Sequence, residues 1–213
     1  MDLPVVFALD RAGIVGEDGE THQGAFDISF LRAIPNMTLF APRDEKSFHQ
    51  ALGFAAEYQH PCSLRYPRGS FTETTLPESV HFELAKSQLL RSSSSDILFV
   101  GYGNGVGRAY ETAELIEVEV SILDLRFVKP LDEEMLKDLS EKHKKWFIFS
   151  DSSKMGGVGS AILEFFSQEK IFDVELESFE YEDEFITHGN TKQVEESLGL
   201  LPKQLALKVK ERV

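Results

Sequence analysis

Short apolar runs alternate with amphipathic stretches along almost the whole chain of 213 residues. Apolar runs bounded by turn residues are typical of buried strands, whereas apolar residues spaced three and four apart indicate helices. Strands that alternate with helices pair in parallel, because each helix carries the chain back across the sheet in a right-handed crossover. The sequence therefore predicts an α/β fold with mainly parallel sheets.

The first part of the chain predicts three strands and two helices. The strands are expected at 4–9, 37–41 and 62–66, and the first is a continuous apolar run of the kind that parallel sheets bury on both faces. A second helix begins after Asp44, whose side chain is suited to cap it. The first helix ends at Pro35, and its apolar face is expected to contain Phe26, Phe30, Leu31 and Ile34. Three strands are few for a complete sheet, so we expect this sheet to be truncated at its amino end.

A change to polar, serine-rich sequence after residue 70 indicates a domain boundary. We predict a first domain at 1–71, a linker at 72–94 with one strand or hairpin inside it, and a second domain at 95–213. The second domain repeats the alternation. Its strands are expected at 97–101, 118–123, 146–150 and 173–176, and its helices at 105–116, 132–142, 159–168, 191–197 and 202–211.

Residues 10–24 form a polar stretch directly after the first predicted strand. The stretch contains four glycines and has no helical or strand periodicity, so it is a loop. α/β proteins bind ligands at the carboxyl ends of their strands. Arg11 carries a planar cation suited to phosphate or carboxylate, while Asp18 and His22 are suited to bond hydroxyl groups or to transfer a proton. The alternative is a surface turn with a capping aspartate and a solvated histidine.

Arg68 follows the third predicted strand. Because neighbouring parallel strands end at one edge of the sheet, Arg68 and Arg11 are expected to face the same crevice and to form a phosphate clamp. The alternative for Arg68 is an ion pair with a local carboxylate. Arg65 lies within the strand, where we expect a structural ion pair.

Two glycine-rich stretches in the second domain have some features of anion-binding turns. The stretch YGNGVGR follows a strand, but its spacing does not complete the G-x-G-x-x-G pattern, so we interpret it as a tight turn before a helix. Gly156, Gly157 and Gly159, with Lys154 nearby, have the composition of an anion cradle. A flexible joint between strand and helix needs no ligand, and we favour that interpretation.

The remaining polar residues predict no metal site. The histidines other than His22 are scattered and match no zinc-binding spacing. The single cysteine, Cys62, excludes an internal disulfide and is expected to be a small core residue in a protein of a reducing compartment. The acidic segment 177–185 lacks the ligand pattern of a calcium loop and is interpreted as a charged edge. Its phenylalanines and Tyr181 are alternative candidates for a subunit interface.

The composition excludes several classes of protein. A formal net charge of −14 opposes binding to nucleic acids and to anionic lipids. No apolar run approaches the ~20 residues of a membrane span, and the first residues lack the features of a signal peptide. Arginine side chains must therefore bind any anionic substrate against an unfavourable overall field.

Two parts of the sequence resemble the family of 1-deoxy-D-xylulose-5-phosphate synthases, which are transketolase-like thiamine-diphosphate enzymes: PVVFALDRAGIVGEDGETHQGAFDISFLRAIPNMTLFAPRDE and LRYPRG at 64–69. The similarity is dense over 3–69 and resumes more loosely at LDLRFVKPLDEEML and EESLGL. It implies the carboxy-terminal third of such a synthase. The implied fold is a truncated parallel-sheet domain of the pyrimidine-binding type, followed by a small α/β domain of the transketolase C-terminal type.

The resemblance also implies an activity. Such a synthase condenses pyruvate with glyceraldehyde 3-phosphate to 1-deoxy-D-xylulose 5-phosphate with loss of CO2, and it supplies precursors of isoprenoids, thiamine and pyridoxal. Thiamine diphosphate, bound with Mg2+, carries the carbanion chemistry. By resemblance, Arg11 and Arg68 bind the acceptor phosphate, and Asp18 and His22 contact its hydroxyl and share proton transfer. A homodimer in the cytoplasm, or in a plastid for a plant protein, is also implied.

The sequence departs from the family pattern in one respect. It carries nothing similar to the Gly-Asp-Gly motif and downstream asparagine that hold Mg2+ and the diphosphate, and the glutamate that activates the aminopyrimidine is expected upstream of Met1. We therefore expect this chain alone to bind no cofactor and to be inactive. Two alternatives stay open: a part of a transketolase or of a 2-oxo acid dehydrogenase β subunit, and a non-catalytic dimerisation module.

Overall fold

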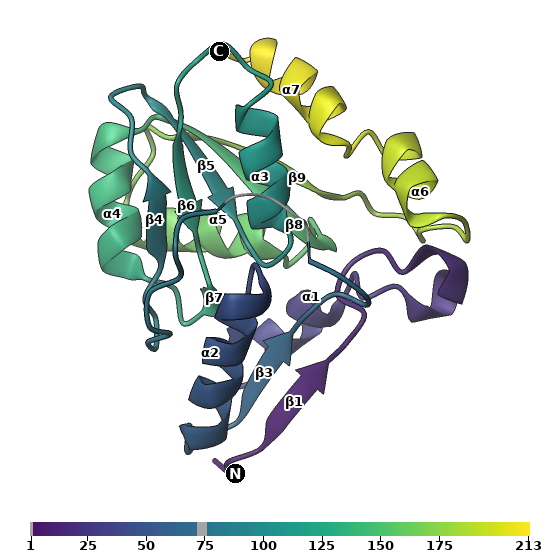
Figure 1. Ribbon diagram of the computed structural model, residues 1–213. Coiled ribbons are helices and arrows are strands. Elements are labelled where there is room, and N and C mark those ends of the chain that lie inside the picture. Colours follow the sequence, from purple (N-terminus) through teal and green to yellow (C-terminus); the bar gives the residue numbers. More distant parts are fainter. Residues whose placement is uncertain (1, 72–75) are drawn as a thin grey trace.

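The computed structural model describes residues 2–71 and 76–213, which form two α/β parts lying against each other (Figure 1). The first part, drawn at the bottom of Figure 1, contains β1 (Val6–Leu9), α1 (Asp27–Arg32), β2 (Thr38–Phe40), α2 (Glu45–Glu57) and β3 (Cys62–Arg65). The predicted α/β class is confirmed. As predicted, Asp44 caps α2, because its carboxylate accepts a hydrogen bond of 2.7 Å from the backbone N–H of Ser47.

The first sheet has the strand order β1-β3-β2-β7, in which β1, β3 and β2 are parallel. Its fourth strand, β7 (Phe127–Lys129), comes from the second part of the chain and pairs antiparallel with β2. The sequence analysis missed β7, because a strand of 3 residues is too short to show an alternating pattern. The second part of the chain thus adds a strand to the sheet of the first part.

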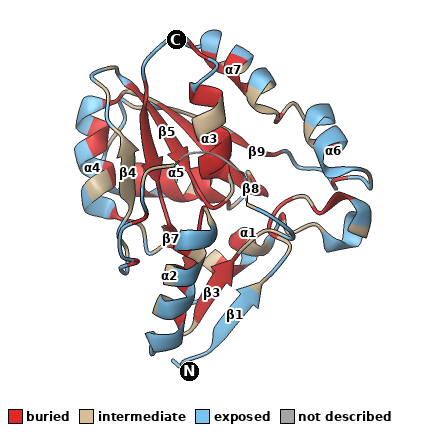
Figure 2. Cartoon of the chain, in the orientation of Figure 1, coloured by how far each residue is buried: buried red, intermediate tan, exposed pale blue. Residues whose placement is uncertain are grey.

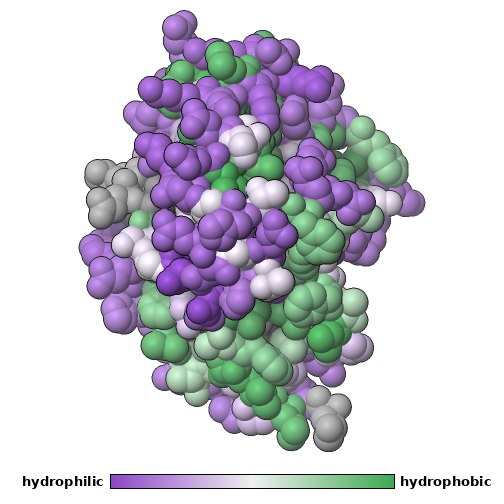
Figure 3. Space-filling model, turned by 90° about the vertical axis from the view of Figure 1, so that its right-hand side faces the viewer, coloured by the Kyte–Doolittle hydropathy of each residue, from purple (hydrophilic) through white to green (hydrophobic). Residues whose placement is uncertain are grey.

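The prediction that the apolar run of β1 is buried on both faces is wrong. Among the described strands, β1 has a neighbour on one side only, and Val6 and Phe7 are 41% and 43% exposed. Figure 2 shows β1 in the colour of exposed residues beside a buried β3. Figure 3 shows hydrophobic side chains spread over the lower half of one face, at the end of the molecule that carries the amino terminus. The apolar pattern identifies a strand but does not reveal which neighbours cover it.

The predicted apolar face of α1 is also partly wrong. Ile28 and Leu31 are buried, whereas Phe26, Phe30 and Ile34 are exposed. The two buried side chains belong to a core cluster that includes residues of the second sheet. The helix therefore turns its buried face toward the second part of the chain.

The second sheet has the order β4-β6-β5-β8-β9, with an antiparallel β4 at one edge and parallel pairs elsewhere. Its strands are β4 (Gln88–Arg91), β5 (Ile97–Gly101), β6 (Ser121–Asp124), β8 (Lys145–Ser153) and β9 (Glu175–Tyr181). The helices of this part are α3 (Gly105–Ala113), α4 (Glu133–Lys142), α5 (Val158–Glu169), α6 (Thr191–Ser197) and α7 (Pro202–Lys210). Each predicted element of the second domain is present within a few residues of its expected limits.

A buried ion cluster also connects the two parts. Arg43 is fully buried, and its Nη1 donates to Oδ2 of Asp124 at 2.7 Å. Arg126 donates to the same oxygen at 3.4 Å, and both guanidinium groups donate to Oε1 of Gln88. Because Arg43 lies directly before α2 and Asp124 ends β6, this cluster holds the first part against the second.

The structure also tests the expectations for Cys62 and for the acidic segment. Cys62 is buried beside Phe40 and Leu64, so the prediction of a core residue is confirmed, and burial raises the pKa of its thiol to about 11. In the acidic segment, Tyr181 and Phe179 are buried in the core of the second part. These two side chains therefore do not form a subunit interface, whereas Phe185, the other phenylalanine of the segment, is 79% exposed. Among the residues described, no helix combines the length and the apolar character needed to cross a membrane.

Candidate active site

The loop at 10–24 has a defined structure, and backbone hydrogen bonds join its two ends. The backbone N–H of Ala12 donates to the carbonyl of Tyr66 at 2.9 Å, directly after β3. Gly13 and Gly24 exchange two backbone hydrogen bonds of 3.0 and 2.9 Å. Two short 3-10 turns, η1 (Gly16–Asp18) and η2 (Glu20–His22), lie between these ends.

The second part of the chain supports this loop at positions where only glycine fits. Gly13 has a φ of 77°, and a Cβ there would lie 2.7 Å from the Cβ of Asp151 in β8. Gly16 has a φ of 51°, and a Cβ there would collide with the carbonyl oxygen of Gly189. Side chains at either position would be strained and would force the loop away from the second part.

The structure brings Arg11 and Arg68 together at Asp18. Nε of Arg11 donates to Oδ2 of Asp18 at 3.0 Å, and Nη1 of Arg68 donates to Oδ1 of the same carboxylate. Nη1 of Arg11 also donates to Asp10 at 2.7 Å. We call Asp10, Arg11, Asp18 and Arg68 the arginine cluster. It lies where β1 and β3 end, as expected for parallel neighbours, and the ion pair considered as the alternative for Arg68 is present as well.

The backbone of Arg11 adopts an unusual conformation. Its φ is 70°, in the left-handed region that residues other than glycine rarely occupy. Such a conformation persists only where the surroundings enforce it, and it is commonest at functional sites. Here the ion pairs to Asp10 and Asp18 hold the side chain.

Electrostatic interactions keep Asp18 ionised. The hydrogen bond from Arg11 lowers the pKa of Asp18, and the charges of Arg68 and His22 lower it further against the opposing effect of burial. Asp18 can therefore accept hydrogen bonds at neutral pH but cannot donate one. His22 is exposed at the end of η2, and its Nδ1 lies 3.0 Å from the hydroxyl of Thr21.

Arg65 forms the structural ion pair that was predicted. Its side chain is buried, and Nε donates to Oδ2 of Asp27 at 2.7 Å. Its Nη2 donates to the carbonyls of Gly24 and Asp151. Arg65 therefore joins the end of the loop, the start of α1 and the end of β8.

Sequence reasoning missed Asp10 as a member of the cluster and treated it only as the start of the loop. Two carboxylates, those of Asp10 and Asp18, pair with the guanidinium group of Arg11. The available signal was the Asp-Arg pair directly after a strand. Sequence adjacency alone does not show that the two side chains turn toward each other.

The glycine-rich turn before α5 holds a carboxylate of the protein itself. Glu180 accepts hydrogen bonds from the backbone N–H groups of Val158 (2.8 Å) and Gly159 (3.1 Å). Ser152 also donates to it, at 2.6 Å. Lys154 is paired with Glu182. The first turn of α5 therefore binds an internal anion, in agreement with the interpretation that this joint needs no external ligand.

Across 2–71 and 76–213, no group of three or more His, Cys, Asp or Glu residues is arranged to hold a metal ion.

Comparison with known proteins places both parts in one family. The model of the transketolase pyrimidine-binding domain matches residues 1–73, and the model of the transketolase C-terminal domain matches residues 85–205. The chain belongs to the transketolase family. Solved transketolases share the fold: one from Campylobacter jejuni subsp. jejuni is 22% identical, with a TM-score of 0.71 over 97% of this chain and 31% of its own.

Within the transketolase family, the predicted resemblance to 1-deoxy-D-xylulose-5-phosphate synthases is confirmed. The synthase of Sulfurimonas denitrificans is 81% identical over 210 residues, and that of Nitratiruptor sp. is 60% identical over 210 residues. Both alignments cover 99% of this chain, but only 35% and 34% of the relatives. The chain thus spans about a third of the length of these curated relatives.

A further solved structure resembles the chain over nearly its full length. It is described as "Split gene transketolase, inactive beta4 tetramer", is 25% identical, and has a TM-score of 0.87 over 99% of this chain and 67% of its own.

Proposed function

We propose that this chain supplies the acceptor-binding part of a 1-deoxy-D-xylulose-5-phosphate synthase, which condenses pyruvate with glyceraldehyde 3-phosphate. The observation that carries the proposal is the meeting of Arg11 and Arg68 at the shared carboxylate of Asp18. Two guanidinium groups held at the carboxyl edge of a parallel sheet are suited to bind a phosphate through paired hydrogen bonds. Identity of 81% to a synthase favours this function over a transketolase or a 2-oxo acid dehydrogenase.

In the proposed complex, Asp18 orients the two arginines. Nε of Arg11 and Nη1 of Arg68 are bonded to its carboxylate, and Nη1 of Arg11 is bonded to Asp10, so Nη2 of each arginine is left to bind the phosphate. The phosphate also competes with Asp18 and Asp10 for the same cations. Anchoring the phosphate fixes the position of the aldehyde of the acceptor.

We assign the proton transfer to His22 in preference to Asp18. The pKa of Asp18 is lowered by Arg11, so this carboxylate accepts a hydrogen bond from a substrate hydroxyl but supplies no proton at neutral pH. His22 is exposed on the same loop and is close enough for its charge to lower the pKa of Asp18. An imidazole can donate to the alkoxide that develops when the acceptor aldehyde is attacked.

We further propose that thiamine diphosphate and Mg2+ are held by other parts of the whole synthase and that this chain alone is inactive. The relatives are about three times as long as the chain, since it covers 35% of the first of them. The described residues include no group of three or more His, Cys, Asp or Glu arranged to hold a metal ion, and the name of the split-gene transketolase structure records an inactive assembly. The curated relatives named above come from bacteria, so we propose the bacterial cytoplasm and not a plastid as the location.

We also propose that the chain associates with itself. The proposal rests on exposed apolar side chains of the first part, including Phe7 of β1 and Phe30 of α1, which are 43% and 59% exposed. The tetramer named for the split-gene transketolase supports it. Light scattering of the purified chain tests the proposal, and a mass of 24.0 kDa at all concentrations would contradict it.

Calorimetric titration with glyceraldehyde 3-phosphate tests the acceptor site. Because charge-assisted hydrogen bonds contribute about 1.5–3 kcal/mol each, Arg11→Ala and Arg68→Ala should each weaken binding by about tenfold or more. Arg212→Ala is the matched control, since Arg212 is 68% exposed and pairs only with Glu177 among the contacts of the described residues. Equal affinity in all variants would contradict the assignment of the phosphate site.

The same preparation tests the proposal that the chain is incomplete. We expect no heat from thiamine diphosphate plus Mg2+ and no consumption of pyruvate. Thiamine-dependent loss of pyruvate with the purified chain would show that the cofactor site is present after all.

A further inference from the structure

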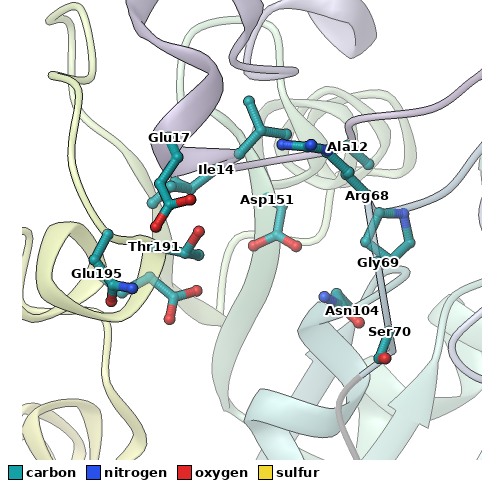
Figure 4. A pocket seen from close by; sticks show the side chains of 13 residues that line it. Ala12, Ile14, Glu17, Arg68, Gly69, Ser70, Asn104, Asp151, Thr191 and Glu195 are labelled. Carbon is teal, nitrogen blue, oxygen red and sulfur yellow. The ribbon is translucent and has the colours of Figure 1, made fainter.

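A cleft of about 520 Å³ opens between the two parts of the chain. Its walls come from the loop before and within η1, the segment after β3, the end of β8 and the start of α6. Figure 4 shows the side chains of Glu17 and Glu195 on one side of the cleft, those of Arg68 and Ser70 on the other, and that of Asp151 between them. Cavities of this size are typical of sites for small molecules.

The cleft lies at the point of the second sheet where α/β proteins bind ligands. From β5 the chain passes through α3 to β6 on one side, and it later returns to β8 on the other side of β5. The order of strands therefore reverses beside β5, and the crevice at the carboxyl ends of such strands is the usual ligand site. Asn104 follows β5, Asp151 is near the end of β8, and both line the cleft.

Carboxylates outnumber the cations in this cleft. Glu17, Asp151 and Glu195 all line it. The guanidinium group of Arg108 forms ion pairs with two of them. Its Nη2 lies 2.9 Å from Oδ1 of Asp151 and 3.0 Å from Oε1 of Glu195. Arg68, the cation in the lining, is already paired with Asp18.

The charge of Glu195 is incompletely balanced. Burial raises the pKa of this carboxyl, and Asp151 raises it further, although Arg108 opposes both effects. Glu17 forms no ion pair with any described residue, and it is exposed at the mouth of the cleft. A cation placed between these two carboxylates would stabilise both in their charged form.

The rest of the lining suits an organic ligand and not a bare ion. Ile14, Val15 and Pro67 supply an apolar wall, and Asn190 and Thr191 supply neutral polar groups. An apolar wall beside fixed carboxylates fits a short carbon chain that carries a protonated nitrogen.

We propose that this cleft binds a small aliphatic amine or guanidine, with Glu17 and Glu195 accepting hydrogen bonds from its protonated nitrogen atoms. Its ligand is opposite in charge to the ligand of the proposed phosphate site, with which the cleft shares Arg68. The two sites are nevertheless adjacent: Glu17 precedes Asp18 in η1, and Arg68 borders the cleft while it contacts Asp18. A ligand in the cleft therefore lies beside the arginine cluster.

Calorimetric titration with 1,4-diaminobutane, compared with the uncharged 1,4-butanediol of the same length, tests the site on the full chain. We expect binding of the diamine alone, weakened by added salt. Glu17→Gln and Glu195→Gln should each weaken it by about tenfold or more, since each removes a charged hydrogen-bond acceptor. The matched controls are Glu20→Gln and Glu196→Gln, which alter exposed neighbours that do not line the cleft.

Thermal unfolding of each variant shows whether the fold is retained. Glu195→Gln removes an ion pair of Arg108, so it affects stability as well as binding. Glu17 is exposed, so Glu17→Gln tests binding without removing a buried contact. Equal heats for diamine and diol, or equal weakening by the control variants, would overturn the proposal. Diamine binding that survives Arg11→Ala would separate this site from the phosphate site, whatever the outcome there.

Discussion

Among single residues, His143 shows how a buried histidine links stability to pH. The residue follows α4 and is 3% exposed, and its Nδ1 lies 2.8 Å from the carbonyl oxygen of Ser95. Burial lowers the pKa of its imidazole below the usual 6.5, and the charge of Lys142 lowers it further. The unfolded chain therefore takes up a proton at a higher pH than the folded chain does.

We expect this residue to reduce the free energy of unfolding as the pH falls below about 6.5. Its contribution is fully present above that pH, because the folded and unfolded states then both hold a neutral imidazole. His143→Gln should flatten the pH dependence measured by urea unfolding between about pH 7 and 5. His49→Gln is the control, because His49 is 70% exposed. Identical slopes for the two variants would rule out this role for His143.

At the scale of elements, the start of α5 shows how a helix can be completed by a distant strand. Gly157 precedes the helix and has no side chain with which to cap it, yet Glu180 of β9 binds the N–H groups of Val158 and Gly159. A carboxylate at a helix amino terminus is favoured by the exposed N–H groups and the helix dipole. Burial nevertheless raises the pKa of Glu180.

Glu180→Ala should lower the free energy of unfolding by about 3 kcal/mol, because it leaves buried donors without an acceptor. Urea unfolding followed by circular dichroism measures the change. The control is Glu182→Ala, whose side chain is 69% exposed and pairs with Lys154 at the surface. Surface pairs contribute about 0–1 kcal/mol, so a similar loss in both variants would contradict the capping role.

At the scale of the whole molecule, the two parts are predicted to unfold together. β7 completes the first sheet, α1 contributes Ile28 and Leu31 to a core cluster of the second part, and Arg43 is bonded to Asp124. These connections use buried groups, so separating the two parts would expose both apolar surface and charge.

Asp124→Asn should therefore destabilise the whole chain by at least about 3 kcal/mol, because two buried arginines lose their common counter-ion. Fluorescence of Trp146, the one tryptophan, reports on the second part, while circular dichroism reports on all helices. We expect the two signals to change together in urea. Asp173→Asn, at a surface pair with Lys144, is the control. Two separate transitions in the unaltered chain would show that the parts unfold independently.

Much of the fold and part of the site could be predicted from the sequence. The alternating pattern predicts nearly all strands and helices, and the ends of two neighbouring strands predict where Arg11 and Arg68 meet. The role of Asp18 between them could not be predicted. Its position depends on glycines 13 and 16, which let the loop approach the second part.

The sequence by itself determined the elements, because each one is encoded by local spacing of apolar residues and by caps such as Asp44. Only the tertiary structure decided that β7 joins the first sheet, that β1 is exposed and that Glu180 caps α5. Local spacing shows which side of an element is apolar or charged. It does not show which distant group covers that side, because that choice is made when separate segments pack together.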